Sequence, residues 1–507
     1  MLSKVRSYAL YGLTGIGVDV EVDVSSGMPS FEIVGLPDAS VKESKERVRS
    51  AIKNSGRKFP HNKITVNLAP ADIKKQGAYL DLAIATGIIC AEDDGFPDSA
   101  KDFVFIGELS LDGSLRGVSG VLPMIISAVS DGFTKFVVPE ENGAEASYVS
   151  GAEVYALKSL KETLSLIGGN ECGFMPVPHT EYIAGDDDEK PVSDMSYVKG
   201  QAFAKRALEV AVAGGHNILL EGPPGAGKSM LAKCIPTIMP DMTFEEALST
   251  TKIHSVAGIL KKEDGIVRKR PFMTPHHTAS GVSIVGGGQN ATPGVISLAN
   301  NGVLYLDEMP EYPRSVLECL RQPLEDREIT VTRTKATVRY PASFMLCGSM
   351  NPCPCGNYGS KDKPCRCSYS EIRKYRARIS EPLLDRIDLQ ISVDAVDYND
   401  LTSDKQEETS AEVKKRVEAA RKIQRERFAD DDINVNAEMR EKHIKKYCVL
   451  DGDCESVLKA SFSALNLSAR ARSRIIKVAR TIADLEGSPD IKPYHILEAV
   501  GYRSKNQ

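Results

Sequence analysis

The stretch EGPPGAGKSM, residues 221–230, limits what this chain can fold into more than any other segment. It contains the pattern G-x-x-x-x-G-K-[ST], between an apolar strand pattern, NILLEG, and a helical pattern, SMLAKCI. A glycine-rich loop in that strand–loop–helix context predicts an α/β domain that binds a nucleoside triphosphate. The residues predicted to surround the phosphates are Gly222, Pro223, Pro224, Gly225, Ala226, Gly227, Lys228 and Ser229.

The chemistry expected of this loop follows from its residue types. Its backbone N–H groups and the positive end of the following helix would face the phosphates. Lys228 would neutralise the β- and γ-phosphate oxygens, and the hydroxyl of Ser229 would ligate Mg²⁺. ATP and Mg²⁺ are therefore the predicted cofactors.

A second stretch, NGVLYLDE (residues 301–308), is an apolar strand pattern that ends in two carboxylates. Both would project at the carboxyl edge of the strand, beside the phosphates. We expect Asp307 to hold the Mg²⁺ shell and Glu308 to orient or deprotonate the attacking water. A surface acidic pair is the weaker reading, because two acids that end a buried strand need a partner such as a metal.

Further polar residues suit an ATPase whose subunits form a ring. Asn351 ends the apolar run FMLCGSMN and is placed to bond the γ-phosphate or the water. Arg386, in PLLDRIDL, is either an arginine finger for a neighbouring subunit's nucleotide or part of a local salt bridge. Arg470, Arg474 and Lys477 lie on neighbouring turns of one helical pattern, and the sequence alone does not choose which contacts nucleotide.

The chain has 507 residues and 42% hydrophobic composition, enough for several domains with full cores. Alternating strand and helix patterns predict an α/β domain over 1–170, and the acidic, Pro- and Ser-containing segment 171–195 reads as a linker. The α/β pattern resumes over 196–398. Residues 399–507 are helical in pattern, with Ser410 as the expected N-cap of the first long helix.

The formal charge of −5 requires any contact with nucleic acid to be local. No run of about 18 apolar residues is present, and the start, MLSKVRSYALYG, is too polar for a signal peptide, so we expect a cytoplasmic protein without a membrane partner. Eleven cysteines in a reducing compartment would mostly be free thiols or metal ligands.

Four of those cysteines lie in NPCPCGNYGSKDKPCRC, a loop with no core to fill. Four thiolates complete the tetrahedral shell of a structural Zn²⁺, although C-x-C is a less usual spacing than C-x-x-C. We therefore predict a Zn²⁺ site over 353–367. Its ligands would be Cys353, Cys355, Cys365 and Cys367.

The segment EDREITVTRTKATVRYPASF predicts a β-hairpin between the two catalytic strands. Its cations are Arg333 and Lys335 at the tip and Arg339 on the return strand. In a ring, copies of this hairpin would form a basic collar that can grip phosphates without reading bases. The alternative is a solvated tip with ordinary surface cations.

Taken together, these stretches resemble the Mg-chelatase-like AAA+ ATPases. The likeness spans nearly the whole chain and includes FEIVGLPDASVKESKERVRSAI, PFMTPHHTAS, VGGG, NPCPCG and LSARARSRIIKVARTIADL. It implies an AAA+ P-loop core, a C-terminal helical lid, and a homo-hexamer that drives DNA branch migration in homologous recombination and natural transformation, with recombination proteins as partners. It also implies that Asn351 is the sensor-1 residue, Arg386 the finger and Arg470 the sensor-2 arginine.

The N-terminal domain resembles the proteolytic domain of Lon proteases, a ribosomal S5 domain 2-like fold. Lon uses a serine activated by a lysine. Alignment places Tyr79 at the serine position and Met124 at the lysine position, so the resemblance implies the fold without the peptidase. Two alternatives to a DNA motor stay open: a motor subunit of a metal chelatase and an ATP-dependent protein remodeller.

Overall fold

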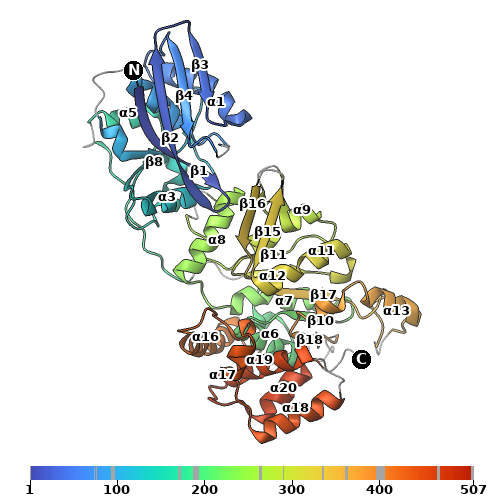
Figure 1. Ribbon diagram of the computed structural model, residues 1–507. Coiled ribbons are helices and arrows are strands. Elements are labelled where there is room, and N and C mark those ends of the chain that lie inside the picture. Colours follow the sequence, from blue (N-terminus) through green and yellow to red (C-terminus); the bar gives the residue numbers. More distant parts are fainter. Residues whose placement is uncertain are drawn as a thin grey trace. The chain divides into compact units, whose positions relative to one another are not determined.

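The computed structural model describes residues 2–72, 75, 77–92, 98–169, 173–185, 193–261, 265–288, 291–333, 336–359, 363–395, 406–464 and 469–503 (Figure 1). The chain forms two compact units. The first contains Met1–Ala184 and Phe244–Val267, and the second contains Gly185–Thr243 and Arg268–Gln507. Helix α8 (Phe244–Ala257) thus belongs to the first unit, although in the sequence it lies between β10 (Ile218–Glu221) and β11 (Phe272–Met273) of the second unit. The domain boundaries expected from the sequence remain predictions.

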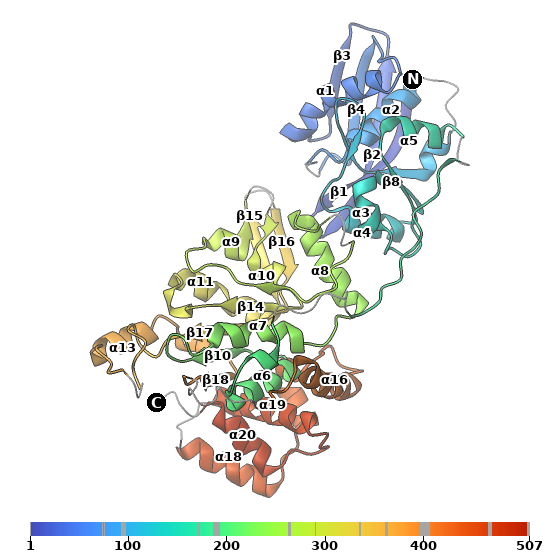
Figure 2. The same cartoon turned by 180° about the vertical axis from the view of Figure 1, so that it is seen from behind.

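The first unit is built on a seven-stranded mixed sheet with the order β3-β4-β2-β1-β5-β8-β9 (Figure 2). Strands β1, β2 and β4 pair antiparallel, and the remaining neighbours pair parallel. The strands are β1 (Leu2–Tyr11), β2 (Thr14–Ser25), β3 (Ser30–Val34), β4 (Lys63–Ala69), β5 (Phe103–Phe105), β8 (Lys135–Pro139) and β9 (Glu153–Leu157). The helices include α1 (Ala39–Asn54), α2 (Asp81–Glu92), α3 (Val121–Ser130), α4 (Gly143–Ala146) and α5 (Leu160–Ile167), and β6 (Glu108–Leu109) and β7 (Leu115–Arg116) form a small hairpin.

Hydrophobic patterning explains the elements of this unit. Strand β2 alternates, and its side chains Val18, Val20 and Val22 are buried, which confirms the strand predicted over 18–24. Ten of the twelve residues of helix α2 are buried, because the helix is largely apolar all round.

The second unit contains a five-stranded sheet with the order β11-β14-β17-β10-β18, in which every neighbouring pair is parallel. The strands are β10 (Ile218–Glu221), β11 (Phe272–Met273), β14 (Val303–Leu306), β17 (Met345–Met350) and β18 (Leu389–Ser392). Helices α6 (Ala202–Gly214) and α7 (Lys228–Ile238) flank β10 in the chain. Because the strand order reverses direction at β10, the crevice at its carboxyl end is where a sheet of this kind binds ligands.

A β-hairpin is inserted between β14 and β17, as predicted. Its strands are β15 (Glu328–Arg333) and β16 (Ala336–Pro341), paired antiparallel, and they follow α11 (Arg314–Cys319) and α12 (Arg321–Asp326). Nearby lie α9 (Gly281–Val285), α10 (Val295–Leu298) and the short pair β12 (Gly286–Gly287) and β13 (Thr292–Pro293). Figure 1 shows the hairpin in yellow beside α9.

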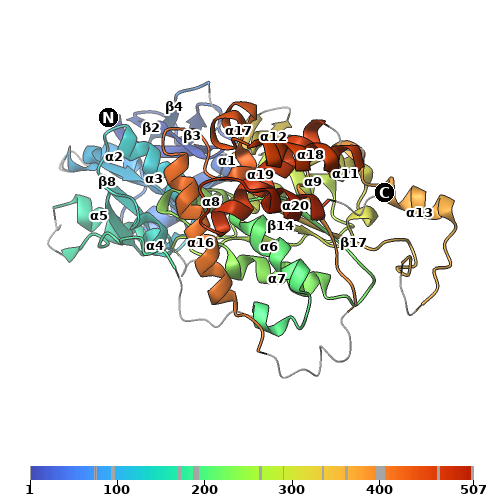
Figure 3. The same ribbon diagram turned by 90° about the horizontal axis from the view of Figure 1, so that it is seen from below.

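The C-terminal part of the second unit is helical and packs on α6 and α7 (Figure 3). Its helices are α16 (Ser410–Arg427), α17 (Glu441–Tyr447), α18 (Gly452–Ala464), α19 (Ala469–Leu485) and α20 (Pro493–Gly501). The N-cap predicted at Ser410 is wrong: Thr409 caps α16 in a capping box with Glu412. The Ser410 hydroxyl is buried instead, where it accepts from the backbone of Met195 over 2.9 Å. Within the described residues, no helix is long and apolar enough to cross a membrane.

Candidate nucleotide site

The glycine-rich loop joins β10 to α7 at the carboxyl edge of the sheet. A side chain at Gly222 would place Cβ 2.2 Å from the carbonyl oxygen of Val393, so only glycine fits there. Gly227 is the N-cap of α7 with φ 85°, a conformation that favours glycine, and a Cβ there would meet no described atom within 4 Å. The loop is therefore close-packed on one side and open where the helix begins.

Lys228 opens α7 and turns its side chain back into the loop. Its Nζ donates to the carbonyl oxygens of Gly222 over 2.7 Å and Pro223 over 2.9 Å, and to Oδ1 of Asn351 over 3.1 Å. Burial lowers the pKa of Lys228, and the nearby carboxylates of Asp307 and Glu308 oppose that shift. The lysine of the phosphate loop and the asparagine that follows β17 thus meet at one point.

Asp307 follows β14 and is surrounded by hydroxyl groups. It accepts from Tyr305 over 2.9 Å and from Ser349 over 2.5 Å at Oδ1, and from Ser229 over 3.2 Å at Oδ2. Burial raises the pKa of this carboxyl, but the hydrogen bonds from Ser349, Tyr305 and Ser229 outweigh it and the net pKa is lowered. The carboxylate is therefore ionised near neutral pH, as a metal ligand must be.

The sequence reasoning missed Tyr305 and Ser349. Both were detectable in principle as polar groups on otherwise apolar strands, but only the register of β14 against β17, with Leu306 opposite Gly348, brings them together. Ser349 also accepts the backbone N–H of Glu308 over 3.1 Å. Glu308 itself has φ 49° and an exposed side chain directly after the buried strand.

These residues fit Mg²⁺ and a nucleoside triphosphate. The Ser229 hydroxyl and the Asp307 carboxylate are hard oxygen ligands, and they lie within 3.2 Å of each other at the start of α7. Lys228 is the adjacent cation, and the open side of the loop exposes the N-terminal end of an eleven-residue helix.

The cysteine cluster lies directly after Asn351. The Sγ atoms of Cys353 and Cys355 are 3.4 Å apart, and each is 3.6 Å from that of Cys365. With Cys367 included, all four lie within 4.8 Å of one another. Four sulfurs at the usual Zn–S bond of about 2.3 Å are about 3.8 Å apart, whereas a disulfide requires about 2 Å. The cluster therefore has the geometry of a closed Zn²⁺ site.

This loop leads into α13 (Tyr369–Arg376), which is tied back to the nucleotide strand. The guanidinium of Arg376 lies 2.6 Å from the carboxylate of Glu221, the last residue of β10. Burial raises the pKa of Glu221, and the charge of Arg376 opposes that shift. The cysteine loop is thus fastened at both ends to the carboxyl edge of the sheet.

Arg386 lies at the amino ends of the strands, whereas the phosphate loop lies at their carboxyl ends. Its carbonyl oxygen accepts from Nδ2 of Asn217 over 2.9 Å, and the backbone N–H of Asp388 donates to the Asn217 carbonyl over 3.0 Å. Asn217 directly precedes β10, whereas the phosphate loop directly follows it. The four residues of β10 separate the two by about 13 Å. The backbone of Arg386 therefore lies beside the amino end of β10, at the other end of this strand from the phosphate loop of the same chain.

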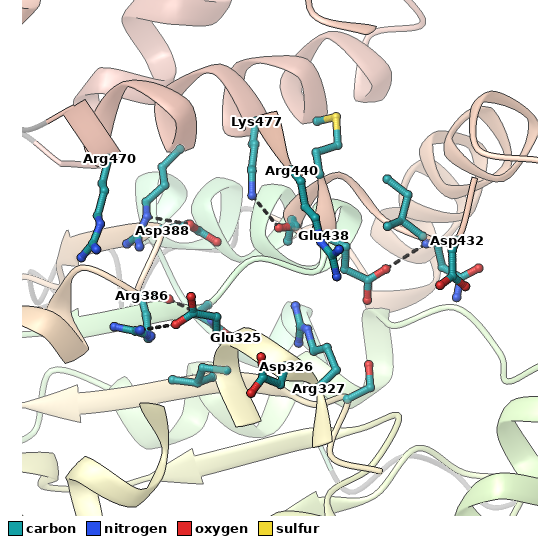
Figure 4. Close-up of a pocket in the computed structure, with 18 residues that line it drawn as sticks. Glu325, Asp326, Arg327, Arg386, Asp388, Asp432, Glu438, Arg440, Arg470 and Lys477 are labelled. Atoms are coloured by element: carbon teal, nitrogen blue, oxygen red, sulfur yellow. Dashed lines mark hydrogen bonds and ion pairs between the residues drawn. The ribbon is translucent and has the colours of Figure 1, made fainter. Parts of the chain in front are cut away.

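The local salt bridge considered for Arg386 exists, but with an unexpected partner. Its guanidinium forms an ion pair with Glu325, and Nη1 donates to the Pro382 carbonyl over 2.8 Å. Neither flanking aspartate forms a side-chain ion pair with Arg386 among the described residues. Figure 4 shows Arg386 and Glu325 joined by a dashed line.

Arg470 lines the same cavity as Arg386, with a volume of about 630 Å³ (Figure 4). Its guanidinium lies 3.7 Å from Asp385, and 70% of its side chain is exposed. Arg474 and Lys477 are more buried: Arg474 approaches Asp388 at 3.8 Å, and Lys477 donates to the Ala437 carbonyl over 2.9 Å. Of the three C-terminal cations, Arg470 is therefore the one free to reach outward.

The hairpin presents one buried and one exposed face. Its inward side chains are Ile329, Val331, Val338 and Tyr340. Arg339 is exposed and lies 3.6 Å from Glu328. The side chain of Arg333 and the whole of Lys335 lie outside the described residues.

In the first unit, Tyr79 and Met124 are both buried. Met124 packs within α3 against Gly15. The substitution of the Lon dyad by these residues stays a prediction.

Comparison with known proteins places this geometry in a family. The description "Magnesium chelatase, subunit ChlI" matches residues 194–401, and "Magnesium chelatase, subunit ChlI C-terminal" matches 407–503. "Subunit ChlI of Mg-chelatase" matches residues 20–142. Competence protein ComM of Haemophilus influenzae is 42% identical over 507 residues, covering 99% of this chain and 97% of the relative.

The chain belongs to the Mg-chelatase-like AAA+ family of ComM and YifB. YifB of Escherichia coli is 40% identical over 506 residues, 99% of this chain and 97% of the relative. Lon protease 2 of Bacillus subtilis is 29% identical over 181 residues, 32% of each chain, which supports the Lon-like likeness. As a member of the ComM/YifB family, the chain has an AAA+ ATPase core for which ATP and Mg²⁺ are the nucleotide and metal.

Proposed function

We propose that this protein is an ATP-driven ring motor that moves DNA strands, with branch migration as its reaction. The subunits assemble head to tail, and each nucleotide binds between two of them. The observation that carries the proposal is the separation of the phosphate loop from Arg386 by the length of β10. A finger at one edge of the sheet and a nucleotide at the other can meet only between subunits.

The residues of one subunit hold and activate the nucleotide. Lys228 leaves the carbonyls of Gly222 and Pro223 to bind the β- and γ-phosphates. Ser229 and Asp307 would hold Mg²⁺, and when bound it would supply neutralisation of charge on the phosphate oxygens. Glu308 orients and deprotonates the water, and Asn351 positions it.

The neighbouring subunit completes the site. Arg386 stabilises the charge that develops on the transferred phosphoryl group, a contribution of about 10³- to 10⁵-fold in related phosphoryl-transfer enzymes. Arg470 lines the same cavity as Arg386 and approaches the same nucleotide as the sensor-2 arginine. Both cations are thereby available in trans rather than in cis.

DNA is the proposed polymer for two reasons. One relative, which matches over 99% of this chain, is named a competence protein, and competence is the uptake of DNA. The hairpin between the catalytic strands carries Arg333, Lys335 and Arg339, so a hexamer would present a collar of cations to a phosphate backbone. We therefore assign the motor to homologous recombination during natural transformation.

A metal-insertion motor is the second candidate, favoured by the match of three segments to Mg-chelatase subunit descriptions. Protein remodelling is the third, favoured by the likeness to a Lon protease.

ATP hydrolysis by the full chain should be measured alone, with forked DNA, with chelatase subunits and protoporphyrin, and with unfolded casein. We expect DNA alone to raise the rate several-fold. Stimulation only by porphyrin components or only by casein would transfer the assignment to the corresponding alternative.

A further inference from the structure

Arg386 is held in its own subunit by a residue at the base of the hairpin. Glu325 lies on α12, which ends at Asp326, and β15 begins at Glu328. Only Arg327 separates them. The ion pair between Glu325 and Arg386 therefore links the proposed finger to the start of the hairpin, across 61 residues of sequence.

Arg327 makes this connection stiff. It has φ 58°, and its backbone carbonyl accepts from the N–H of Ala342, one residue beyond β16. Its guanidinium donates to the Phe344 carbonyl over 2.9 Å, just before β17 begins. Both strands of the hairpin are thus fastened to the residue that follows Glu325 and Asp326, so a shift of α12 is transmitted to the hairpin base.

The bound position of Arg386 leaves part of its donor capacity unused. Nη1 and Nη2 are paired with Pro382 and Glu325, but Nε is buried without a hydrogen-bond partner among the described residues. A guanidinium has five donors, and a buried unpaired one costs free energy. An arrangement in which the guanidinium binds phosphate oxygens would relieve that cost.

We propose that Glu325 is a positioning residue that latches Arg386 and couples the finger to the hairpin. With the latch closed, Arg386 is held away from the neighbouring nucleotide. DNA bound to the hairpin shifts α12, opens the Glu325–Arg386 pair and releases the finger. By linkage, if bound DNA strengthens the binding of the finger to a neighbouring nucleotide, that nucleotide strengthens DNA binding by the same factor. This coupling rests on the proposed function.

The exposure of the two partners suits a latch rather than a permanent support. Glu325 has 65% of its side chain exposed, and Arg386 has 17%. Ion pairs at the solvent-exposed surface are weak, and water reaches this pair from the Glu325 side, so the latch can open at modest cost. A fully buried pair would be too costly to break in each catalytic cycle.

The test compares ATP hydrolysis by the full-length Glu325→Gln variant and the wild type, each with and without forked DNA. We expect the DNA-free rate to rise about two- to fivefold, the range of a partly exposed ion pair. The DNA-stimulated rate should stay within twofold of wild type, so the stimulation ratio falls. Glu318→Gln, which breaks the Glu318–Arg321 pair at 2.9 Å without touching Arg386, should change neither rate.

A second readout separates a latch from a structural support. DNA affinity without nucleotide should increase in Glu325→Gln, because the open latch favours the hairpin position that binds DNA. Glu325→Asp, which keeps the charge, should lie between the wild type and Glu325→Gln in both DNA affinity and DNA-free rate. A wild-type DNA-free rate and ratio in both variants would overturn the latch. If DNA fails to stimulate even the wild type, the proposed function fails; the latch then survives only if the DNA-free rate of Glu325→Gln still rises.

Discussion

The ammonium of Lys228 and the amide oxygen of Asn351 lie 3.1 Å apart, joining the carboxyl ends of the adjacent strands β10 and β17. A cation and an oriented dipole thus converge where the γ-phosphate is expected. The same edge carries Asp307 with its three hydroxyl donors. Each of these contacts can be tested separately.

Replacement of Lys228 by alanine should weaken ATP binding about 10- to 100-fold, because one or two hydrogen bonds to charged phosphate oxygens are lost. Titration with a fluorescent ATP analogue measures this directly. Lys233→Ala removes an exposed lysine from the same helix and should bind as the wild type does. Equal affinity in the Lys228 variant would exclude it from the phosphate site.

Replacement of Glu308 by glutamine should leave ATP binding intact and slow hydrolysis at least 100-fold, the usual contribution of a positioned base. Single-turnover hydrolysis separates the two effects. The matched control is Glu311→Gln, one turn further along and paired with Arg378 at 2.7 Å. A native turnover rate in the Glu308 variant would remove it from the mechanism.

The purified protein should contain about one Zn²⁺ per chain by elemental analysis, because four sulfurs already lie within 4.8 Å of one another. Cys353→Ser combined with Cys365→Ser should abolish the metal and lower the melting temperature. Cys319→Ser changes an exposed cysteine outside the cluster and should do neither. The site would be contradicted if the wild type contained no zinc and the two serine substitutions left its melting temperature unchanged.

Asp388 should make stability depend on pH. Burial raises its pKa, but the hydrogen bond to His216 and the charges of His216, Arg474 and Lys477 outweigh it, so the folded-state pKa lies below the ordinary value of 3.8. The stabilisation is therefore fully present above about pH 4 and is lost as pH falls through the folded-state pKa.

Asp388→Asn should accordingly cost about 2 kcal/mol at pH 7, and the difference from wild type should shrink below pH 4. Denaturant midpoints at a series of pH values measure it. Asp490→Asn, an exposed control, should have little effect. A difference that grows toward acid would reverse the assigned direction.

Arg339→Ala should weaken DNA binding several-fold and reduce its salt dependence, because six copies would each lose a phosphate contact. Arg425→Ala, an exposed arginine on α16, is the matched control. Fluorescence anisotropy at several salt concentrations gives both quantities. Unchanged affinity and salt slope would leave Arg339 paired with Glu328 as a surface cation.

Local motifs predicted the elements of the second unit well. The loop 222–229 and the acidic end of β14 could be read directly, because a glycine loop between a strand and a helix and a carboxylate pair after an apolar strand are short-range patterns. The hairpin was predictable for the same reason. Its alternation and turn lie within 14 residues.

What the sequence did not predict depends on contacts between distant residues. Ser349 supports Asp307 from another strand, and Glu325 binds Arg386 from another helix. Such pairings depend on sheet register and helix packing, which no local pattern encodes. The N-cap of α16 failed differently: Thr409 and Ser410 are both good caps, and the position of Glu412 three residues after Thr409 decides between them.

The central claim is that each catalytic pocket is shared between two subunits, and mixing two inactive variants tests it directly. Lys228→Ala removes the phosphate lysine, and Arg386→Ala removes the finger. Neither should hydrolyse ATP alone. Mixed rings contain interfaces in which an intact loop faces an intact finger, so ATPase activity should reappear on mixing and depend on the ratio of the two variants. If the mixtures stay inactive while co-assembly is demonstrated, Arg386 acts within its own subunit or not at all, and the shared pocket is contradicted.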